Sequence, residues 1–333
     1  MRYLYFDTSR NIYEQLTEIF DFVWPTATGM WNLRWQVQGY VLANPGATVK
    51  ELEGRFVAGS KIHGANLQRA CIEHDWEKQQ EQFAKFLVTN LCALYEAWIK
   101  QVMESLSVSD ENIGKQLQFP TIINANGVRK GVWSTIDGLT STKSTFLTGF
   151  YSALSSHPKN SKDKIDNILK CYRFFKESRN CLVHHGGIAS DHLVSVYAEF
   201  LSVATPEQLG VKEVPAYYPV ITGQPIKLSL RGVVGLGDII LKIIATLDAE
   251  LSQSVYAELE FEKQWRNKYA NKYTLKADGT PEKLAAKERQ LRRLVSGLGF
   301  PSPAETSEIE SFLRTIPSPV APQLSVVNLP IVE

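Results

Sequence analysis

The sequence predicts a mainly α-helical protein with a small β-hairpin and a basic helical extension toward the C-terminus. Apolar residues recur at steps of three and four over several long segments, which is the helical period. The most apolar run, residues 233–247, is about 15 residues long and contains Asp238 and Lys242, which favours a buried helix over a membrane span. Asn126-Gly127 between two short apolar runs predicts the hairpin.

Composition limits the classes of protein to consider. The 333 residues carry 36 basic and 35 acidic side chains and a formal charge of +1, so any contact with nucleic acid must come from local patches. The four cysteines, at 71, 92, 171 and 181, have no C-x-x-C spacing and are expected to be reduced, mostly buried thiols. The N-terminal stretch lacks the apolar run of a signal peptide, so we expect a cytoplasmic protein with no membrane contact.

The first third of the chain is predicted to be helical. Apolar spacing indicates a helix over residues 10–24, ended by Pro25 and Gly29. Thr48, with Glu51 three residues later, has the signature of a capping box. A long helical stretch over 61–107 is expected to present one apolar stripe to the core: Phe83, Phe86, Leu87, Leu91, Leu94, Trp98, Val102 and Leu106.

In the remainder of the chain, helices are expected over 162–185 and 236–255. The glycine-rich residues 232–238 are expected to form the N-terminus of a helix that packs closely against its neighbours. Residues 217–230 are predicted to form two short strands around a turn at Gly223, and His192 is expected in a loop. The predicted organisation is an N-terminal helical segment (1–60), a helical domain (61–255), a basic helical extension (256–299) and a Pro/Ser-rich tail (300–333).

Residues 174–187, FFKESRNCLVHHGG, hold the most informative pattern. Arg179 falls into the apolar stripe between Phe175 and Leu182. Burying an unpaired guanidinium costs several kcal/mol, so Arg179 must meet a carboxylate, a ligand phosphate or water. Asn180 and His184 are four residues apart and share a helix face.

Arg179 and His184 are five residues apart and diverge by about 140° on an ideal helix. They converge only if the helix end unwinds, which Gly186-Gly187 would permit, or if two such helices face each other. The alternative is structural: Arg179 pairs with Glu177, Glu96 or Glu199, and the histidines cap the helix.

The hexapeptide R-N-C-L-V-H at 179–184 resembles the R-x4-H motif of HEPN domains. The resemblance covers roughly residues 60–205 and extends at most to 255. It implies a helical bundle that pairs with a second copy so that two motifs face one cleft. It also implies a metal-independent endoribonuclease of a prokaryotic antiphage defence or toxin–antitoxin system, without a cofactor. The sequence contains no metal-ligand motif such as H-E-x-x-H.

The resemblance implies a role for each motif residue. His184 would act as general base or acid, Arg179 would stabilise charge on the phosphate, and Asn180 would orient the phosphate or the histidine. His185 gives an R-x5-H spacing and is expected to be a neighbour or substrate contact. Glu177 and Glu96 are candidate partners of Arg179. Gly186 stands where one toxin subgroup has a tyrosine, so control by modification of that tyrosine is not expected.

A second candidate surface lies at residues 261–273, where aromatic residues recur every fourth position with cations between them. A basic aromatic helix contacts RNA by stacking and charge neutralisation, although packing of its aromatic edge on the bundle is the favoured alternative. The candidate RNA contacts are Lys263, Trp265, Arg266, Lys268, Tyr269 and Lys272.

Three functions therefore remain open. The first is an RNA-cleaving homodimer, controlled by a regulatory partner protein. The second is a non-catalytic HEPN-like interaction module that binds a partner through the helix at 261–293. The third is an RNA-binding accessory protein without nuclease activity.

Overall fold

The computed structural model describes residues 4–269, 280–303 and 305–315. The protein is mainly helical and has one two-stranded antiparallel sheet among these residues, as the sequence predicts. None of the helices in the described ranges is long and apolar enough to cross a membrane.

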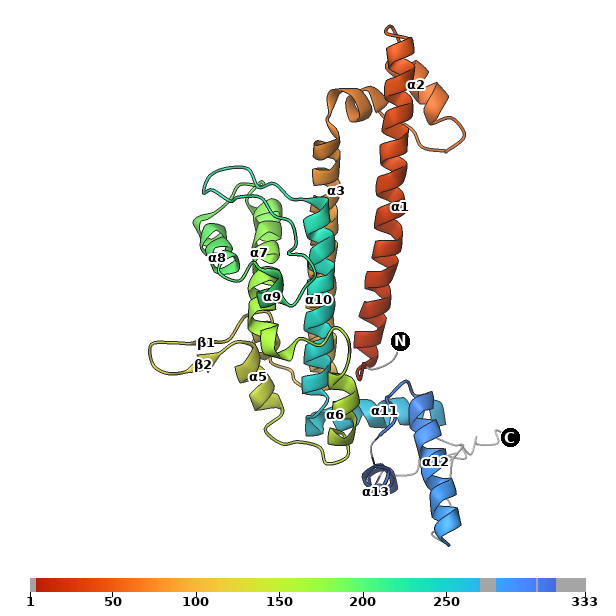
Figure 1. The fold of residues 1–333 in the computed structure, drawn as a ribbon, viewed down its shortest axis with the longest axis vertical. Helices are drawn as coiled ribbons and strands as arrows, with labels where there is room; N and C mark the ends of the chain where they lie inside the picture. The colour runs from red at the N-terminus through yellow and green to blue at the C-terminus, as the bar shows by residue number, and fades with distance from the viewer. Residues whose placement is uncertain (1–3, 270–279, 304, 316–333) are drawn as a thin grey trace, which may run out of the picture.

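Helix α10 (Leu230–Leu251) lies at the centre of the fold. It packs against α1 (Asp7–Ala43), α3 (Trp76–Ser105), α6 (Thr148–Ser155) and α7 (Ile165–His184), as Figure 1 shows. Every residue from Ile239 to Leu251 is buried. The predicted buried helix is therefore confirmed, although it starts and ends several residues before the expected 236–255.

Helix α1 is longer than the sequence predicts. It runs without interruption for 37 residues through Pro25 and Gly29, so the predicted end at Pro25 is wrong. Proline removes one helical hydrogen bond, but tertiary packing offsets that loss. Val23 is buried in the main core just before the proline. Beyond it, the Arg34 guanidinium donates to the His74 carbonyl at 2.6 Å and fixes the second half of the helix.

The far end of α1 has a small core of its own. Helix α2 (Val49–Phe56) and the π-helical turn η1 (Gln68–Glu73) pack there, around five residues: Val37, Leu52, Val57, Leu67 and Cys71. The capping box of Thr48 and Glu51 is confirmed, since the Glu51 amide donates to Thr48 Oγ1 and the Thr48 amide to the Glu51 carboxylate. All four cysteines are free and buried, as expected.

The predicted helix over 61–107 is two helices. Between η1 and α3 the chain turns at His74 and Asp75, and the Asp75 carboxylate caps α3 by accepting the Lys78 amide at 2.6 Å. Most of the predicted stripe on α3 is buried, but Phe86 is 77 % exposed and contributes nothing to the core.

The middle of the chain forms the hairpin. Helix α4 (Glu111–Gln116) precedes β1 (Ile122–Ile123) and β2 (Arg129–Lys130), and α5 (Val132–Leu139) follows them. The strands pair antiparallel, with Ile122 opposite Lys130, and Gly127 adopts φ +74° in the turn, so the Asn-Gly hairpin is confirmed. A 3-10 turn, η2 (Lys162–Lys164), leads into α7.

After α7 come α8 (Asp191–Leu201) and α9 (Pro206–Leu209). His192 lies in the first turn of α8, so its predicted place in a loop is wrong. The two strands predicted within 217–230 are also wrong, since that described segment contains none. Pro219 and Pro225 have no amide hydrogen to donate to a ladder. The expected turn at Gly223 is present, with φ +74°.

The C-terminal part packs on the same core as the bundle. It consists of η3 (Val255–Ala257), α11 (Glu258–Tyr269), α12 (Pro281–Gly297) and α13 (Ser307–Thr315). Phe261 stacks with Phe300 at 5.2 Å between ring centroids, and Phe300 in turn lies 5.0 Å from Tyr5. One hydrophobic core thus extends from Tyr5 to Leu313. The predicted domain limits stay a prediction.

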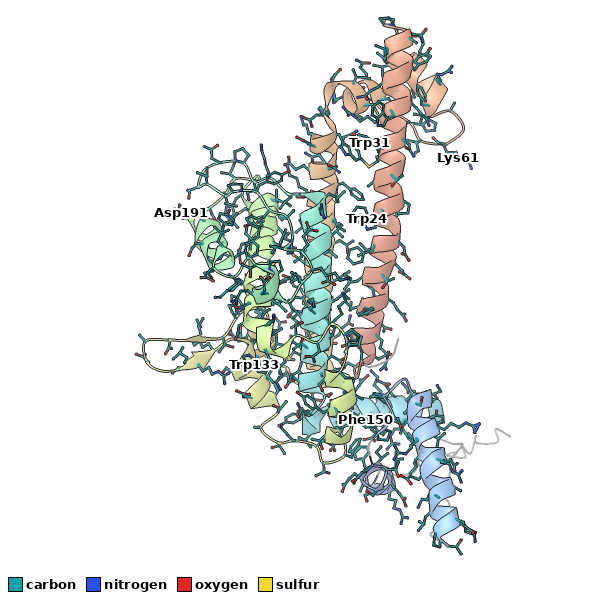
Figure 2. The ribbon with its side chains drawn as sticks, in the orientation of Figure 1. Trp24, Trp31, Lys61, Trp133, Phe150 and Asp191 are labelled. Atoms are coloured by element: carbon teal, nitrogen blue, oxygen red, sulfur yellow. The ribbon has the colours of Figure 1, made fainter. Side chains whose placement is uncertain are left out.

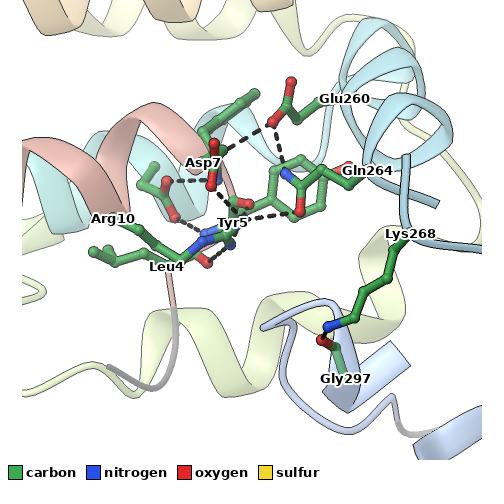
Figure 3. A network of polar contacts seen from close by, with 10 residues as sticks. Leu4, Tyr5, Asp7, Arg10, Glu260, Gln264, Lys268 and Gly297 are labelled. Atoms are coloured by element: carbon green, nitrogen blue, oxygen red, sulfur yellow. Dashed lines mark hydrogen bonds and ion pairs between the residues drawn. The ribbon is translucent and has the colours of Figure 1, made fainter. Parts of the chain in front are cut away.

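The start of α1 is held by polar contacts with α10 and α11 (Figure 3). The buried Asp248 carboxylate accepts the amides of Tyr5 at 2.6 Å and Phe6 at 3.0 Å. The Arg10 guanidinium donates to the Tyr5 carbonyl at 2.9 Å and to Gln264 Oε1 at 2.8 Å. Burial raises the pKa of Asp248 from 3.8 to about 6, and the hydrogen bonds that it accepts oppose that shift.

A first prediction concerns close packing at the start of α10. A Cβ atom at Gly232 would lie 1.8 Å from the Ala216 carbonyl oxygen, a backbone atom that no side-chain rotation can move. We expect Gly232→Ala to lower the free energy of unfolding by at least about 3 kcal/mol in urea denaturation followed by circular dichroism. Gly29→Ala is the control: nothing lies within 4 Å of its Cβ, and helix propensity should raise stability by up to about 1 kcal/mol. Equal effects of the two changes would contradict the packing at Gly232.

A second prediction concerns Asp248. Its pKa is raised in the folded protein, so the folded state binds this proton more tightly than the unfolded chain does. The stability that the protonated Asp248 contributes is therefore fully present below about pH 4. The free energy of unfolding falls by about 3 kcal/mol as the pH rises through about 6. Asp248→Asn does not ionise, so its unfolding free energy should rise relative to wild type between pH 4 and pH 7. A difference that stays constant over this range would show that the amides of Tyr5 and Phe6 hold the carboxylate ionised.

Candidate active site on helix α7

The last turn of α7 is regular as far as His184. The amides of His185 and Gly187 donate to the Cys181 carbonyl at 2.9 and 3.0 Å. Gly186 and Gly187 have φ values of +61° and +82°, so the predicted glycine C-cap is confirmed. Because the helix does not unwind before His184, Arg179 and His184 of one chain point in different directions.

The chain just after the motif is held by a short ladder. The Ala189 amide donates to the Gln224 carbonyl at 2.9 Å, the Gly223 amide to the Ala189 carbonyl at 2.9 Å, and the Ile226 amide to the Gly187 carbonyl at 2.8 Å. These bonds join the end of α7 to the segment before α10. They fix where His184 and His185 stand relative to the bundle.

Arg179 is half-buried and has no carboxylate partner among the described residues. Its Nη1 donates to Asn180 Oδ1 at 3.1 Å, and its Nε is buried with no hydrogen-bond partner. The structural alternative, a pair with Glu177, Glu96 or Glu199, is not found in this part of the chain. Burial raises the pKa of the Cys92 thiol on α3 to about 12, and the positive charge of nearby Arg179 opposes the shift.

The two nearest acidic candidates are bound to other cations. Glu177 pairs with Arg173 at 3.1 Å, and Glu96 pairs with Lys176 of α7 at 2.9 Å. Both carboxylates are therefore neutralised without Arg179. The guanidinium keeps a net positive charge that no neighbouring acid in the described structure compensates.

Asn180 stands at the centre of a polar chain across the exposed face of α7. It accepts from Arg179 and donates through Nδ2 to Glu177 Oε2 at 3.1 Å. The Nε2 atom of His192 on α8 lies 3.9 Å from the same Glu177 oxygen and 3.4 Å from the Arg173 guanidinium. Side chains of α7 and α8 thus hold the Asn180 amide in one orientation.

His184 and His185 are both exposed, and neither ring has a polar side-chain contact in the described structure. Asn180 and His184 lie one helical turn apart on one face, as predicted. The protein therefore presents a free imidazole and an oriented amide on one face of α7, and an uncompensated guanidinium on a different side of the same helix.

The residues proposed on α11 lie elsewhere. Phe261 is fully buried, and Trp265 and Tyr269 pack against the core, with Tyr269 Oη donating to the Leu294 carbonyl at 3.0 Å. Arg266 pairs with Glu262 at 2.7 Å. The aromatic edge thus faces inward, as the packing alternative expects. RNA binding through Lys263, Arg266 and Lys268 stays a prediction, and Lys272 lies outside the described residues.

Sequence reasoning named Glu177, Asn180 and His184 but missed Arg173 and Lys176. The five residues follow one another at steps of one, three and four, so a helical projection of the motif segment would have placed them together. Gln118, Phe119 and His192 come from other elements, and only the fold brings them there.

Comparisons of this chain with protein-family models, with curated proteins and with solved structures find no match. The case for a function therefore depends on the residues and geometry of the α7 surface.

Proposed function

We propose that the chain is a metal-independent endoribonuclease of the HEPN type, with Arg179, Asn180 and His184 as its catalytic residues. The observation that carries this proposal is the state of Arg179. Its guanidinium is half-buried, lacks a carboxylate partner in the described structure, and stands beside an amide held in place by Glu177. Arginine remains charged and offers a planar fork of donors, which suits a phosphodiester.

The chemistry needs only proton transfer and charge stabilisation. The ribose 2′-oxygen attacks the adjacent phosphorus, its proton passes to an imidazole, and the bond from phosphorus to the 5′-oxygen breaks as that oxygen takes up a proton. Histidine titrates near neutral pH and suits both transfers. Arg179 stabilises the extra charge on the phosphate oxygens. The products are a 2′,3′-cyclic phosphate and a 5′-hydroxyl.

Two copies of the chain would form one cleft. Within one copy, Arg179 and His184 diverge by about 140°, and the regular helix end excludes convergence by unwinding. A facing α7 from a second copy would bring His184 of one chain opposite Arg179 of the other. His185, next to the catalytic ring, would contact substrate, while Glu177 and Glu96 act indirectly by holding Asn180 and Lys176.

The biological setting proposed is the one the resemblance implies: a cytoplasmic defence or toxin–antitoxin protein restrained by a regulatory partner. An uncontrolled ribonuclease would damage its own host, so control of the α7 face is expected.

A third prediction tests the catalytic residues. Arg179→Ala and His184→Ala should each reduce the rate of RNA cleavage by at least about 100-fold in buffer containing EDTA, because each removes charge stabilisation or proton transfer. Arg69→Ala and His63→Ala, on the distant α2–η1 end, are matched controls and should cut at the wild-type rate. Gel analysis should show 2′,3′-cyclic phosphate ends. Wild-type cleavage by both α7 variants, with circular dichroism showing folded protein, would exclude the assignment.

The second candidate function is a non-catalytic interaction module, and one surface favours it. Trp24, Trp31 and Trp35 of α1 lie within about 40° of one direction on an ideal helix and are 51 %, 38 % and 57 % exposed. Figure 2 shows Trp24 and Trp31 on the side of α1 that faces α3. Exposed aromatic patches of this kind occur at protein-binding sites. This surface fits a partner better than the inward-facing aromatic edge of α11.

A fourth prediction separates the two functions. The double variant Trp31→Ser/Trp35→Ser should cleave RNA at the wild-type rate if the chain is a nuclease, because the ring contacts of Trp31 are with Trp35 and Trp76 and not with the catalytic residues of α7. The interaction module predicts instead that wild-type protein cuts no RNA. It also predicts a stoichiometric complex from the native host that the double variant loses and that Phe22→Ser, on the opposite side of α1 and 63 % exposed, retains.

A further inference from the structure

A cavity of about 660 Å³ adjoins the α7 surface, between α3, α4 and α7. Its apolar lining includes Ile99, Met103, Val108 and Phe119. The volume lies in the range of small-ligand sites. Polar and charged side chains of α3, α4 and α7 surround this apolar part of the lining. A planar aromatic ligand fits this description better than a chain of sugars or phosphates.

The polar end of the cavity is built from three linked side chains. The Lys176 ammonium donates to Gln118 Oε1 and pairs with Glu96 Oε1 at 2.9 Å. Gln118 is only 6 % exposed, yet its amide nitrogen has no partner among the described residues and is not sealed from solvent. Because Gln118 lines the cavity, we infer that this free donor is available to a ligand bound there. The second oxygen of Glu96 is likewise an unused acceptor in the described structure.

Two connections join this cavity to the candidate active site. Lys176 precedes Arg179 by three residues, which is about 4.5 Å along the axis on the same side of α7. The Arg173 guanidinium lies 4.2 Å over the Phe119 ring and also pairs with Glu177, which holds Asn180. A base bound beside Lys176 would therefore lie about one helical turn from Arg179, a distance that its own ribose and phosphate can span.

We propose that this cavity is a nucleobase pocket that selects guanine next to the scissile phosphate. The inference rests on the proposed ribonuclease function for its role, because the pocket would position the nucleotide that is cut. Single-stranded RNA is recognised by stacking of exposed bases and by hydrogen bonds to their edges. The pocket supplies both, through Phe119 and through the polar end.

The pattern of free groups favours guanine over the other bases. A carboxylate only accepts hydrogen bonds, and the Gln118 amide nitrogen only donates them. Guanine presents two adjacent N–H donors, one for the unused Glu96 oxygen and one for the oxygen that it shares with Lys176, and one carbonyl oxygen for Gln118 on the same edge. Uracil, cytosine and adenine each present only one N–H group there, so none of them can donate to both oxygens of Glu96.

The fifth prediction measures binding of four probes, the 3′-monophosphates of guanosine, adenosine, cytidine and uridine, by calorimetry on the full chain. Guanosine 3′-monophosphate should bind about tenfold more tightly than the others, the discrimination typical of a good base-edge pair. Gln118→Met removes the free donor and should abolish the preference. Ser109→Trp, an exposed position that lines the cavity, should block it without disturbing the core. Ile113→Trp, on α4 but lining a different cavity, is the matched control and should keep the preference.

Each outcome decides one question. Equal binding of the four nucleotides, or a preference that survives Ser109→Trp, overturns the pocket even if the protein cuts RNA. Preferential guanosine binding that Ser109→Trp removes supports it, including when Gln118→Met fails to fold. Guanosine selectivity without RNA cleavage would overturn the ribonuclease and leave the pocket as a nucleotide site. If the protein is a ribonuclease and the cavity binds guanine, wild type should cleave RNA on the 3′ side of guanosine. Ser109→Trp should cleave without that preference.

Discussion

The burial of α10 on every side is the constraint on which the rest of the structure depends. A helix with no exposed residue from Ile239 to Leu251 needs neighbours all around it, and α1, α3, α6 and α7 are those neighbours. Burying its apolar side chains is the main source of stability here. Close approach demands glycine: a Cβ at Gly237 would meet the Phe20 ring at 2.1 Å. Asp248, a fully buried carboxylate near the end of α10, accepts hydrogen bonds from the start of α1.

The character of the α7 surface follows from this arrangement. One side of α7 packs on α10 and another on α8, so the remaining face must be polar to meet water. In the motif segment, Arg173 and Lys176 pair with carboxylates, whereas Arg179 has no such partner in the described structure. A buried donor without a partner, such as its Nε, costs about 1–3 kcal/mol, and the guanidinium cannot lose its proton to escape that cost. A buried polar group that lowers stability and makes no compensating contact is typical of a functional position.

Local signals in the sequence predicted local structure well. The Thr48–Glu51 capping box, the Asn126-Gly127 hairpin and the glycine cap after His184 each depend on a few neighbouring residues, and all three are confirmed. Prediction was wrong where distant contacts decide. Helix α1 passes through Pro25 because packing along its length outweighs one lost hydrogen bond. Residues 223–226 pair with the end of α7 instead of forming a hairpin with themselves. The Gln118–Lys176–Glu96 group joins three segments, and no spacing rule connects them.

The charge balance of the chain bears on how such a site would choose its substrate. A protein with a net charge of +1 cannot hold RNA by a broad electrostatic field, because non-specific affinity grows with the number of phosphates neutralised. In the motif segment of α7, Arg173 and Lys176 pair with carboxylates and Arg179 does not, which leaves a charge suited to one phosphate and not to a tract of them. Affinity must then come from a contact that carries sequence information. A base pocket one helical turn away would supply it, and it would make cleavage depend on an unpaired base that leaves the stack. A weakly charged ribonuclease with a base pocket would spare double-stranded RNA and cut only exposed loops and ends.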